Sequence, residues 1–302
     1  MTRNKLGTGH IKIENRKLVF DYIFNNPGIS RPVIASLTKL SVASVCRIAD
    51  ELVELGIVRE SDCDAGKVGR RPALLHVCGE SVPALAVELD RGKQVCAAVD
   101  LTGKVHYRTE RQYNVLEFSP EEICSFVLEM CNDVMTQPCM SGRQFIGVSL
   151  VMPGIIDFET GTVIFSSQFR WSNVPLVEIL KKSFPDMEIA LDNDMNARAL
   201  AESLYGELRN EQNAAILGIG SGVGAGLIIN RRVYRGNSFT AGEVGHIPVD
   251  LNGKMCECGN YGCLQTYLAD WAILDDARKY KQDADIGLFW RRQTTTNSGR
   301  HQ

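Results

Sequence analysis

From about residue 82 onward, apolar strand-like segments alternate with amphipathic helical segments, and this alternation constrains the fold more than any other feature. Strands are expected over 84–89, 94–101, 104–113 and 145–154, and a helix over 119–137 with Ser119 as its cap. The pattern continues with a helix over 175–184, a strand over 188–194, a helix over 195–208 and a glycine-broken strand pair over 214–230. Such alternation is typical of layered α/β proteins rather than of bundles or sandwiches.

The first 80 residues follow a different pattern, in which three short helices precede a hairpin. The helical spacing that begins near Glu14 stops at Pro27-Gly28, after which Ser30 can cap a second helix and Ser41 a third. Two apolar segments, 57–58 and 73–77, then flank a polar loop that is rich in Gly, Lys and Arg. This order predicts a winged helix-turn-helix, the alternative being a solvated three-helix cap with an ordinary charged loop.

Charge supports a nucleic-acid partner for this segment. Residues 1–80 carry 12 Lys+Arg against 9 Asp+Glu, whereas the remainder of the chain is acidic. Small polar side chains at the start of the third helix allow close approach to DNA, and basic side chains at the hairpin tip can neutralise phosphates. The predicted DNA-binding residues are Ser30, Arg31, Ser41, Ser44, Arg47, Lys67, Arg70 and Arg71.

Composition and segment lengths bear on the setting of the protein. No apolar run reaches the ~18 residues of a membrane span, and the N-terminal sequence lacks the apolar region of a secretion signal. We therefore expect a cytoplasmic protein without membrane insertion, in which the ten cysteines do not form disulfides.

Three of those cysteines lie within eight residues. Cys256, Cys258 and Cys263 follow His246, which precedes the first of them by ten residues. Three thiolates and one imidazole suit tetrahedral Zn²⁺, and four protein ligands leave no open position for catalysis, so the pattern predicts a structural zinc site. The alternative is free thiols beside an unrelated histidine. Glu243, three residues before His246, is a candidate acceptor for ligand hydroxyls or equally a helix-capping carboxylate.

Taken together, several longer motifs are similar to those of the ROK family, which comprises sugar-responsive repressors of the NagC/Mlc/XylR type and sugar kinases. The resemblance runs from about Asn15 to Asp270. It is carried by ISRPVIASLTKLSVASVCRIADELVELGIVRE (29–60), GRRPALL (69–75), LDNDMNARALAE (191–202), GIGSGVGAGLI (218–228) and the G-E-x-G-H…C-x-C-G-x-x-G-C-L pattern (242–264).

The resemblance implies an actin-like (ribonuclease H-like) fold of the sugar kinase type, with two α/β lobes around a cleft. It also implies sugar contacts at Asn193, Asp194, Glu243, His246 and Gln265. Asp194 matches the catalytic base of the kinases, although from the residues alone it is equally a cap of the following helix. The five glycines between 218 and 226 match a phosphate loop.

Three departures from the family pattern bear on function. Glu88-Leu89-Asp90-Arg91-Gly92 replaces the glycine-rich first phosphate loop of the kinases, which disfavours ATP binding. Gln265 stands where the family has a glutamate, and this change bears on ligand affinity. Residues 281–302 form a polar tail without the family pattern, so the second lobe is expected to be incomplete.

The sequence therefore predicts a winged helix-turn-helix domain over 1–80, a sugar-binding domain with a zinc motif over 81–280 and a tail over 281–302. The expected function is a transcriptional repressor of carbohydrate genes without enzymatic activity. It would bind operator DNA and a sugar effector, as a homodimer if the shortened lobe permits one. The alternatives are an ATP-dependent sugar kinase and a non-sensing remnant that still binds DNA.

Overall fold

The computed structural model describes residues 8–61 and 73–280, and these divide into two compact units. The first unit consists of Met1–Ala86, Cys96–Thr109 and Glu129–Val148. The second consists of Val87–Val95, Glu110–Leu128 and Ser149–Gln302.

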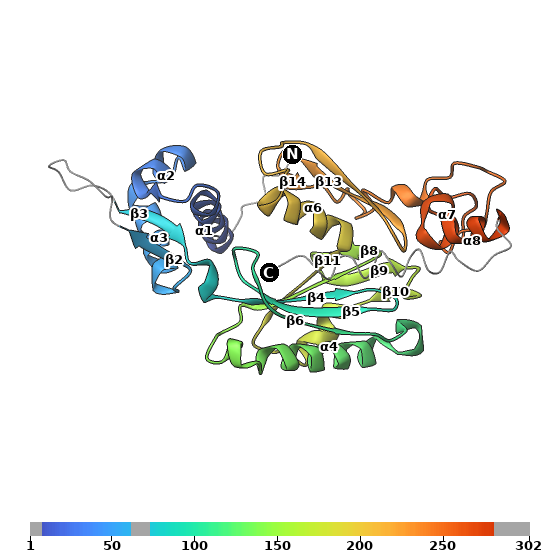
Figure 1. The fold of residues 1–302 in the computed structure, drawn as a ribbon. Coiled ribbons are helices and arrows are strands. Elements are labelled where there is room, and N and C mark those ends of the chain that lie inside the picture. Colours follow the sequence, from blue (N-terminus) through green and yellow to red (C-terminus); the bar gives the residue numbers. More distant parts are fainter. Residues whose placement is uncertain (1–7, 62–72, 281–302) are drawn as a thin grey trace. The chain divides into compact units, whose positions relative to one another are not determined.

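Three helices and a small sheet form the N-terminal part of the first unit (Figure 1). The elements are α1 (Thr8–Asn25), β1 (Ile29–Ser30), α2 (Arg31–Thr38), α3 (Val42–Glu54), β2 (Val58–Ser61) and β3 (Leu74–Val77). Strand β3 pairs antiparallel with both β1 and β2. A common apolar core joins all of these elements, with Ile29 as the contribution of β1. Its largest fully buried members are Ile23, Ile34 and Leu75. The expected order of three helices and a hairpin is therefore present.

Local hydrogen bonds explain where α3 begins and ends. The Ser41 hydroxyl accepts a hydrogen bond from the backbone N–H of Ser44 at 3.1 Å, which satisfies a free donor of the first turn. The helix stops before Gly56, which adopts a positive φ of 69° that suits glycine. Ser30 occupies the corresponding N-cap position of α2, but its side chain makes no capping hydrogen bond.

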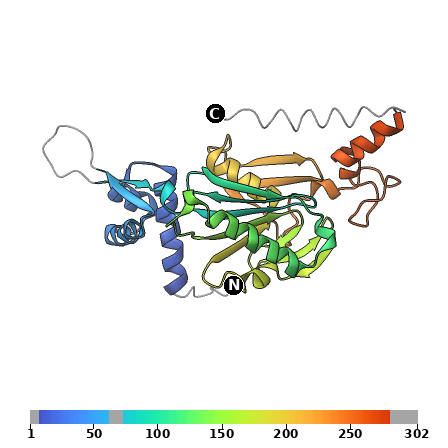
Figure 2. The same ribbon diagram turned by 60° about the horizontal axis from the view of Figure 1, so that its bottom comes forward.

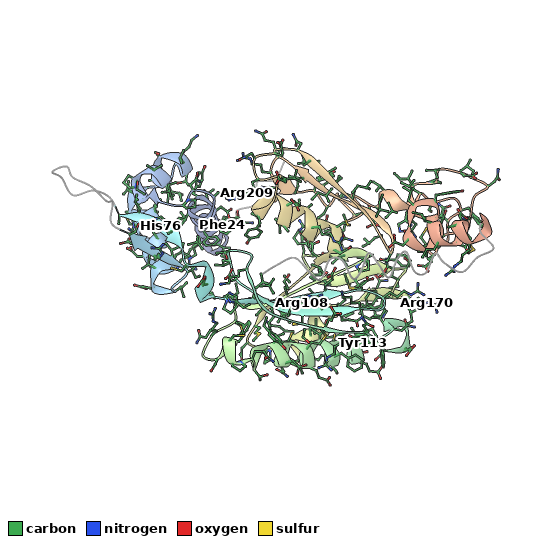
Figure 3. All side chains as sticks on the ribbon, in the orientation of Figure 1. Phe24, His76, Arg108, Tyr113, Arg170 and Arg209 are labelled. Atoms are coloured by element: carbon green, nitrogen blue, oxygen red, sulfur yellow. The ribbon has the colours of Figure 1, made fainter. Side chains whose placement is uncertain are left out.

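The predicted α/β pattern continues in a five-stranded sheet with the strand order β11-β7-β4-β5-β6. Its strands are β4 (Ala84–Leu89), β5 (Gln94–Val99), β6 (Val105–Arg111), β7 (Gly147–Met152) and β11 (Glu188–Asn193). Helix α4 (Pro120–Met135) begins with a capping box, in which Ser119 and Glu122 each accept a hydrogen bond from the other's backbone N–H. Tyr113 packs edge-on against Phe126 of this helix, with ring centroids 4.9 Å apart (Figure 3).

A further three-stranded sheet lies in a segment where the sequence pattern indicated no strands. Strands β8 (Ile155–Asp157), β9 (Thr162–Ser166) and β10 (Trp171–Val174) pair antiparallel in the order β10-β9-β8, and α5 (Leu176–Lys181) follows. Two residues in and before β10, Arg170 and Asn173, adopt positive φ angles without being glycine. The β9–β10 turn thus carries no glycine signal, whereas Gly161, with a φ of 69°, marks the β8–β9 turn and is a signal that the strand prediction did not use.

Helix α6 (Asp194–Tyr205) packs on the last of the four sheets among the described residues. This sheet contains β12 (Ala214–Ile219), β13 (Val223–Ile229) and β14 (Arg232–Val233), in that order and antiparallel. Both ribbon views show α6 lying along these strands (Figure 1 and Figure 2). The chain continues through η4 (Val244–His246), α7 (Gln265–Leu268) and α8 (Asp270–Tyr280). Three further short 3₁₀ helices are η1 (Gly79–Ser81), η2 (Val115–Glu117) and η3 (Pro138–Met140).

Close approach between α6 and β13 depends on glycine. A Cβ atom on Gly226 would lie 2.2 Å from the carbonyl oxygen of Met195 and 2.6 Å from the Cβ of Ala199. Gly218 and Gly224 face the Met195 side chain in the same way. These three glycines therefore have a packing role.

We expect Gly226→Ala to lower the free energy of unfolding by about 1–3 kcal/mol, because the methyl group forces backbone apart in a packed layer. Urea unfolding of the purified chain measures this effect. Gly220→Ala is the matched control, since a Cβ there meets no atom within 4 Å. Equal stability of the two variants would contradict the packing role.

Within the described ranges, no helix combines the length and the hydropathy that a membrane crossing requires.

Candidate metal centre and ligand cavity

The predicted metal ligands come together. The ligand atoms of His246, Cys256, Cys258 and Cys263 all lie within 4.8 Å of one another. His246 Nδ1 is 3.6 Å from Cys256 Sγ, and the Sγ atoms of Cys258 and Cys263 are 3.7 Å apart. Three sulfur donors and one nitrogen donor around a common point could hold a metal ion.

The loop that carries the cysteines folds back on itself through glycine turns. Cys256 N–H donates to Asn260 O at 2.8 Å, and Gly259 N–H donates to Cys256 O at 2.9 Å. A Cβ on Gly262, which has a φ of +63°, would lie 1.6 Å from Asp250 O, so only glycine fits there. The glycines of the cysteine motif thus create the turn that brings three thiols to one place.

Gln265 contacts the metal centre through Cys256. Its side chain is buried, and Nε2 donates a hydrogen bond to Cys256 Sγ at 3.2 Å. Gln265 also lines a cavity of about 340 Å³ in the second unit. The residue expected to contact ligand is therefore also a partner of a metal-ligand sulfur.

The cavity is lined by the ends of several elements. The end of β4, the start of α6, the turn between β12 and β13, η4 and the cysteine loop all contribute. Its lining includes all five predicted sugar contacts, namely Asn193, Asp194, Glu243, His246 and Gln265. Lining residues that the sequence analysis did not single out for a ligand include Gln168, Arg198 and Glu257. Glu257 lies between two metal-ligand cysteines in the sequence, and this position could have indicated that it lines the cavity.

Carboxylates dominate the charge of the cavity. The acidic residues of its lining are Glu88, Asp90, Asp194, Glu243 and Glu257. Arg198 is the one Lys or Arg in the same lining, and its Nη2 lies 3.5 Å from Glu88 and 4.0 Å from Asp194. A cavity with this balance repels anionic groups and offers acceptors to hydroxyl groups.

Asp194 and Glu243 are two partly buried members of this acidic set, and the pKa of each is raised. Burial raises the pKa of Asp194, and the nearby Glu88 carboxylate adds to that effect against the opposing charge of Arg198. Burial, followed by the charge of Asp194, raises the pKa of Glu243. Both carboxylates line the same cavity.

Asn193 and His246 already interact with other groups of the protein. Asn193 Oδ1 accepts from the backbone N–H groups of Met195 and Asn196, and its Nδ2 donates to Gly154 O. It is thus the N-cap of α6, with one amide hydrogen left for a ligand. His246 Nε2 lies 3.8 Å from Glu243 Oε2, and burial lowers the pKa of its imidazole, which favours the neutral form that ligates metals.

The loop after β4 is folded by acidic side chains. Asp90 Oδ1 accepts from Arg91 N–H at 2.7 Å, and Arg91 Nη1 donates to Glu257 at 3.0 Å. This loop therefore presents carboxylates and an ion pair beside the cavity, which Glu88 and Asp90 line.

The predicted DNA-binding residues have mixed environments. Ser41 and Arg47 are exposed on the N-terminal half of α3, and Ser44 is half-buried there. Ser30 is buried, and Arg31 is 17% exposed and forms ion pairs with Asp50 and Glu60. These contacts support a structural role for Arg31. Its assignment as a DNA contact stays a prediction, and Lys67, Arg70 and Arg71 lie outside the described residues.

Comparison with known proteins gives a family match. The model described as "ROK family" matches residues 84–299. The xylose repressor of Caldicellulosiruptor bescii is 31% identical over 269 residues, which are 89% of this chain and 67% of that protein. The chain thus spans about two thirds of the length of this relative. The match extends to residue 299, within the segment 281–302 that the sequence predicts to be a separate tail. The boundary between the sugar-binding domain and this tail at residue 280 stays a prediction.

Two solved structures are similar in fold. A ROK family transcriptional regulator, described as a homologue of the Escherichia coli Mlc protein, aligns with a TM-score of 0.72 and 28% identity, covering 90% of this chain and 68% of its own. A ROK glucokinase from Streptomyces griseus, solved with glucose and AMPPNP, aligns with a TM-score of 0.59 and 24% identity, covering 65% of this chain and 60% of its own. The mixed α/β fold is therefore similar to those of ROK repressors and of sugar kinases.

Proposed function

This chain belongs to the ROK family, and on that premise we propose that it is a DNA-binding transcriptional repressor of carbohydrate uptake or catabolism genes. Its effector is a sugar or sugar derivative that binds in the cavity of the second unit. A repressor named for xylose and a transcriptional regulator of the same family support this function.

The observation that carries the proposal is the charge of the cavity. The lining has five carboxylates and one arginine, and Arg91 outside the lining pairs with Glu257, so carboxylates remain in excess. This balance suits a neutral polyol, whose hydroxyl groups donate hydrogen bonds to ionised acceptors. Asp194 and Glu243 would accept from ligand hydroxyls, and the free amide hydrogen of Asn193 would donate to a ring or hydroxyl oxygen.

We assign zinc to the metal centre. Zn–S bonds of about 2.3 Å and Zn–N bonds of about 2.0–2.1 Å in a tetrahedron require donor separations of roughly 3.5–3.8 Å. Two of the donor separations, 3.6 and 3.7 Å, fit that requirement, and all four ligand atoms lie within 4.8 Å of one another. Bound zinc would supply structural stability by holding the cysteine loop against His246. With Nδ1 on the metal, the neutral imidazole keeps its proton on Nε2, the nitrogen closer to Glu243.

The DNA-binding part would be a winged helix-turn-helix made of α1–α3 and the β2–β3 hairpin. Helix α3 would enter the major groove with Ser41, Ser44 and Arg47 at its N-terminal half, and Lys67, Arg70 and Arg71 would neutralise phosphates. Two copies would bind an operator with two half-sites, in the cytoplasm where the DNA is. The sugar would bind with different affinities to the DNA-binding state of the dimer and to the state that does not bind DNA. Sugar binding would therefore change the affinity for DNA.

DNA binding is tested by electrophoretic mobility shift with fragments from upstream of carbohydrate genes. We expect salt-sensitive, sequence-selective binding of the wild-type chain. Arg47→Ala should weaken it about 10-fold or more, since a side chain that contacts DNA contributes ~1–3 kcal/mol. Lys182→Ala removes the same charge from an exposed site on the second unit and should bind like wild type. Non-selective or absent binding by the wild-type chain would refute the proposal.

A sugar kinase is the second candidate, because Asp194 lines the cavity and the fold is similar to that of a ROK glucokinase. The carboxylates of Glu88 and Asp90 at the first phosphate-loop position oppose it, since they repel a triphosphate. Assays of ATP-dependent phosphorylation of hexoses and N-acylated hexosamines distinguish the two, with Asp194→Asn as the blank. Turnover above that blank would favour the kinase. A chain that binds DNA but shows no sugar-dependent thermal shift would instead be a non-sensing remnant.

A further inference from the structure

The orientation of the Gln265 amide is fixed by the chemistry of its neighbour. Its Nε2 lies 3.2 Å from Cys256 Sγ, and a metal-bound thiolate accepts hydrogen bonds but donates none. The amide nitrogen must therefore face the sulfur, because the amide oxygen would be repelled there. The Oε1 atom is left toward the cavity, 3.7 Å from the position of a Cβ on Gly222.

A thiolate-rich metal site benefits from such a donor. Three thiolates and Zn²⁺ leave the centre with a net negative charge, and a hydrogen bond to a ligand sulfur lowers the cost of that charge in a buried place. Cys256 and Gln265 are both buried, so water competes little for the sulfur. Gln265 is thus placed to influence how tightly the site holds its metal.

We propose that Gln265 is a positioning residue of the metal centre. Its side-chain N–H group donates a hydrogen bond to the Cys256 thiolate and thereby raises the zinc affinity of the site. Its Oε1 atom is then the group that faces the cavity. The zinc part of the inference rests on the donor geometry alone. The part that concerns the cavity rests on the proposed function, in which the ligand is a sugar.

Glutamine at this position is a departure from the family pattern, which has a glutamate here. A carboxylate at 265 would have no hydrogen to donate and would place a second negative charge beside three thiolates. Gln168 offers a comparison within the same cavity. Its Nε2 would lie 3.4 Å from a Cβ on Gly222, it makes no contact with a ligand sulfur among the described residues, and its buried Oε1 has no hydrogen-bond partner among them.

The test uses the full chain and measures zinc affinity by competition with a chromogenic chelator. Gln265→Glu and Gln265→Leu remove the donor with and without an added charge. We expect zinc affinity to fall about 10- to 100-fold in Gln265→Glu and toward the lower end of that range in Gln265→Leu. Gln168→Glu adds the same charge to the cavity without removing a hydrogen bond to sulfur, and it should stay close to wild type.

Cobalt substitution gives a second readout that needs neither DNA nor sugar. The thiolate-to-Co²⁺ absorption band should shift in both Gln265 variants, because the electron density on Cys256 changes, and should not shift in Gln168→Glu. If Gln265→Glu fails to fold, Gln265→Leu still decides the matter. Wild-type zinc affinity and an unchanged cobalt band in Gln265→Leu would overturn the proposal. Neither result depends on whether the chain binds DNA, so a failure here is distinct from a failure of the proposed function.

Discussion

Cys263→Ser is expected to abolish zinc binding and to unfold the loop between His246 and α7. Cys263 is fully buried, its sulfur lies 3.7 Å from that of Cys258, and its backbone forms a bridge with Pro248. The loop has little other core to hold it, since Leu251 is 83% exposed and Met255 66% exposed. Structural zinc in small sites supplies an apparent ~10–16 kcal/mol of binding free energy, so the loss should be severe.

Metal content by mass spectrometry and limited proteolysis of the loop measure this outcome. Cys139→Ser is the matched control, because Cys139 is an exposed free cysteine in η3, far along the chain from the metal ligands. The control should keep one zinc per chain and the proteolytic pattern of the wild type. Stoichiometric zinc and an intact loop in Cys263→Ser would contradict the assignment of this ligand.

Asp194→Asn is expected to stabilise the free protein while weakening ligand binding. Burial raises the pKa of Asp194, so the ionised form is less favourable in the folded chain than in the unfolded chain. The ionised carboxylate therefore costs stability at neutral pH, a cost that diminishes as the pH falls toward the unfolded-state pKa. Asparagine removes the charge. It also removes a charge-assisted hydrogen bond to ligand worth about 1.5–3 kcal/mol, which corresponds to roughly 10- to 100-fold in affinity.

Asn193, not Asp194, caps α6, so opposite signs of these two effects distinguish a ligand-binding carboxylate from one that only stabilises the first turn of the helix. The thermal midpoint of the free chain reports the first effect, and calorimetric titration with the sugar that binds the wild-type chain reports the second. Asp186→Asn, an exposed substitution outside the cavity, should change neither. A lower midpoint together with unchanged ligand affinity would show that Asp194 serves only the start of α6.

Sequence reasoning predicted the elements whose signals are local. The spacing of Cys256, Cys258 and Cys263 was enough for the metal centre, because a short glycine-containing loop has few ways to bring three thiols together. The Ser41 and Ser119 caps were predicted correctly for the same reason, since a helix start depends on residues within one turn.

Features that depend on distant partners were not predictable. The ion pairs of Arg31 join it to Asp50 and Glu60, which lie 19 and 29 residues away, and its role as a DNA contact stays a prediction. The glycines at 218, 224 and 226 were matched to a phosphate loop, and their packing role depends on contacts with Met195 and Ala199 of α6. The bond between Gln265 and the Cys256 sulfur likewise depends on the fold of the loop between them.

The central claim is that a sugar in the cavity changes the affinity of the chain for DNA. Fluorescence anisotropy of a labelled operator fragment, titrated with the chain in the absence and presence of D-xylose, D-glucose or N-acetyl-D-glucosamine, tests it most directly. We predict that one sugar weakens operator binding, and that the operator weakens binding of that sugar by the same factor, as thermodynamic linkage requires. A sugar that binds without changing the affinity for the operator would contradict the account.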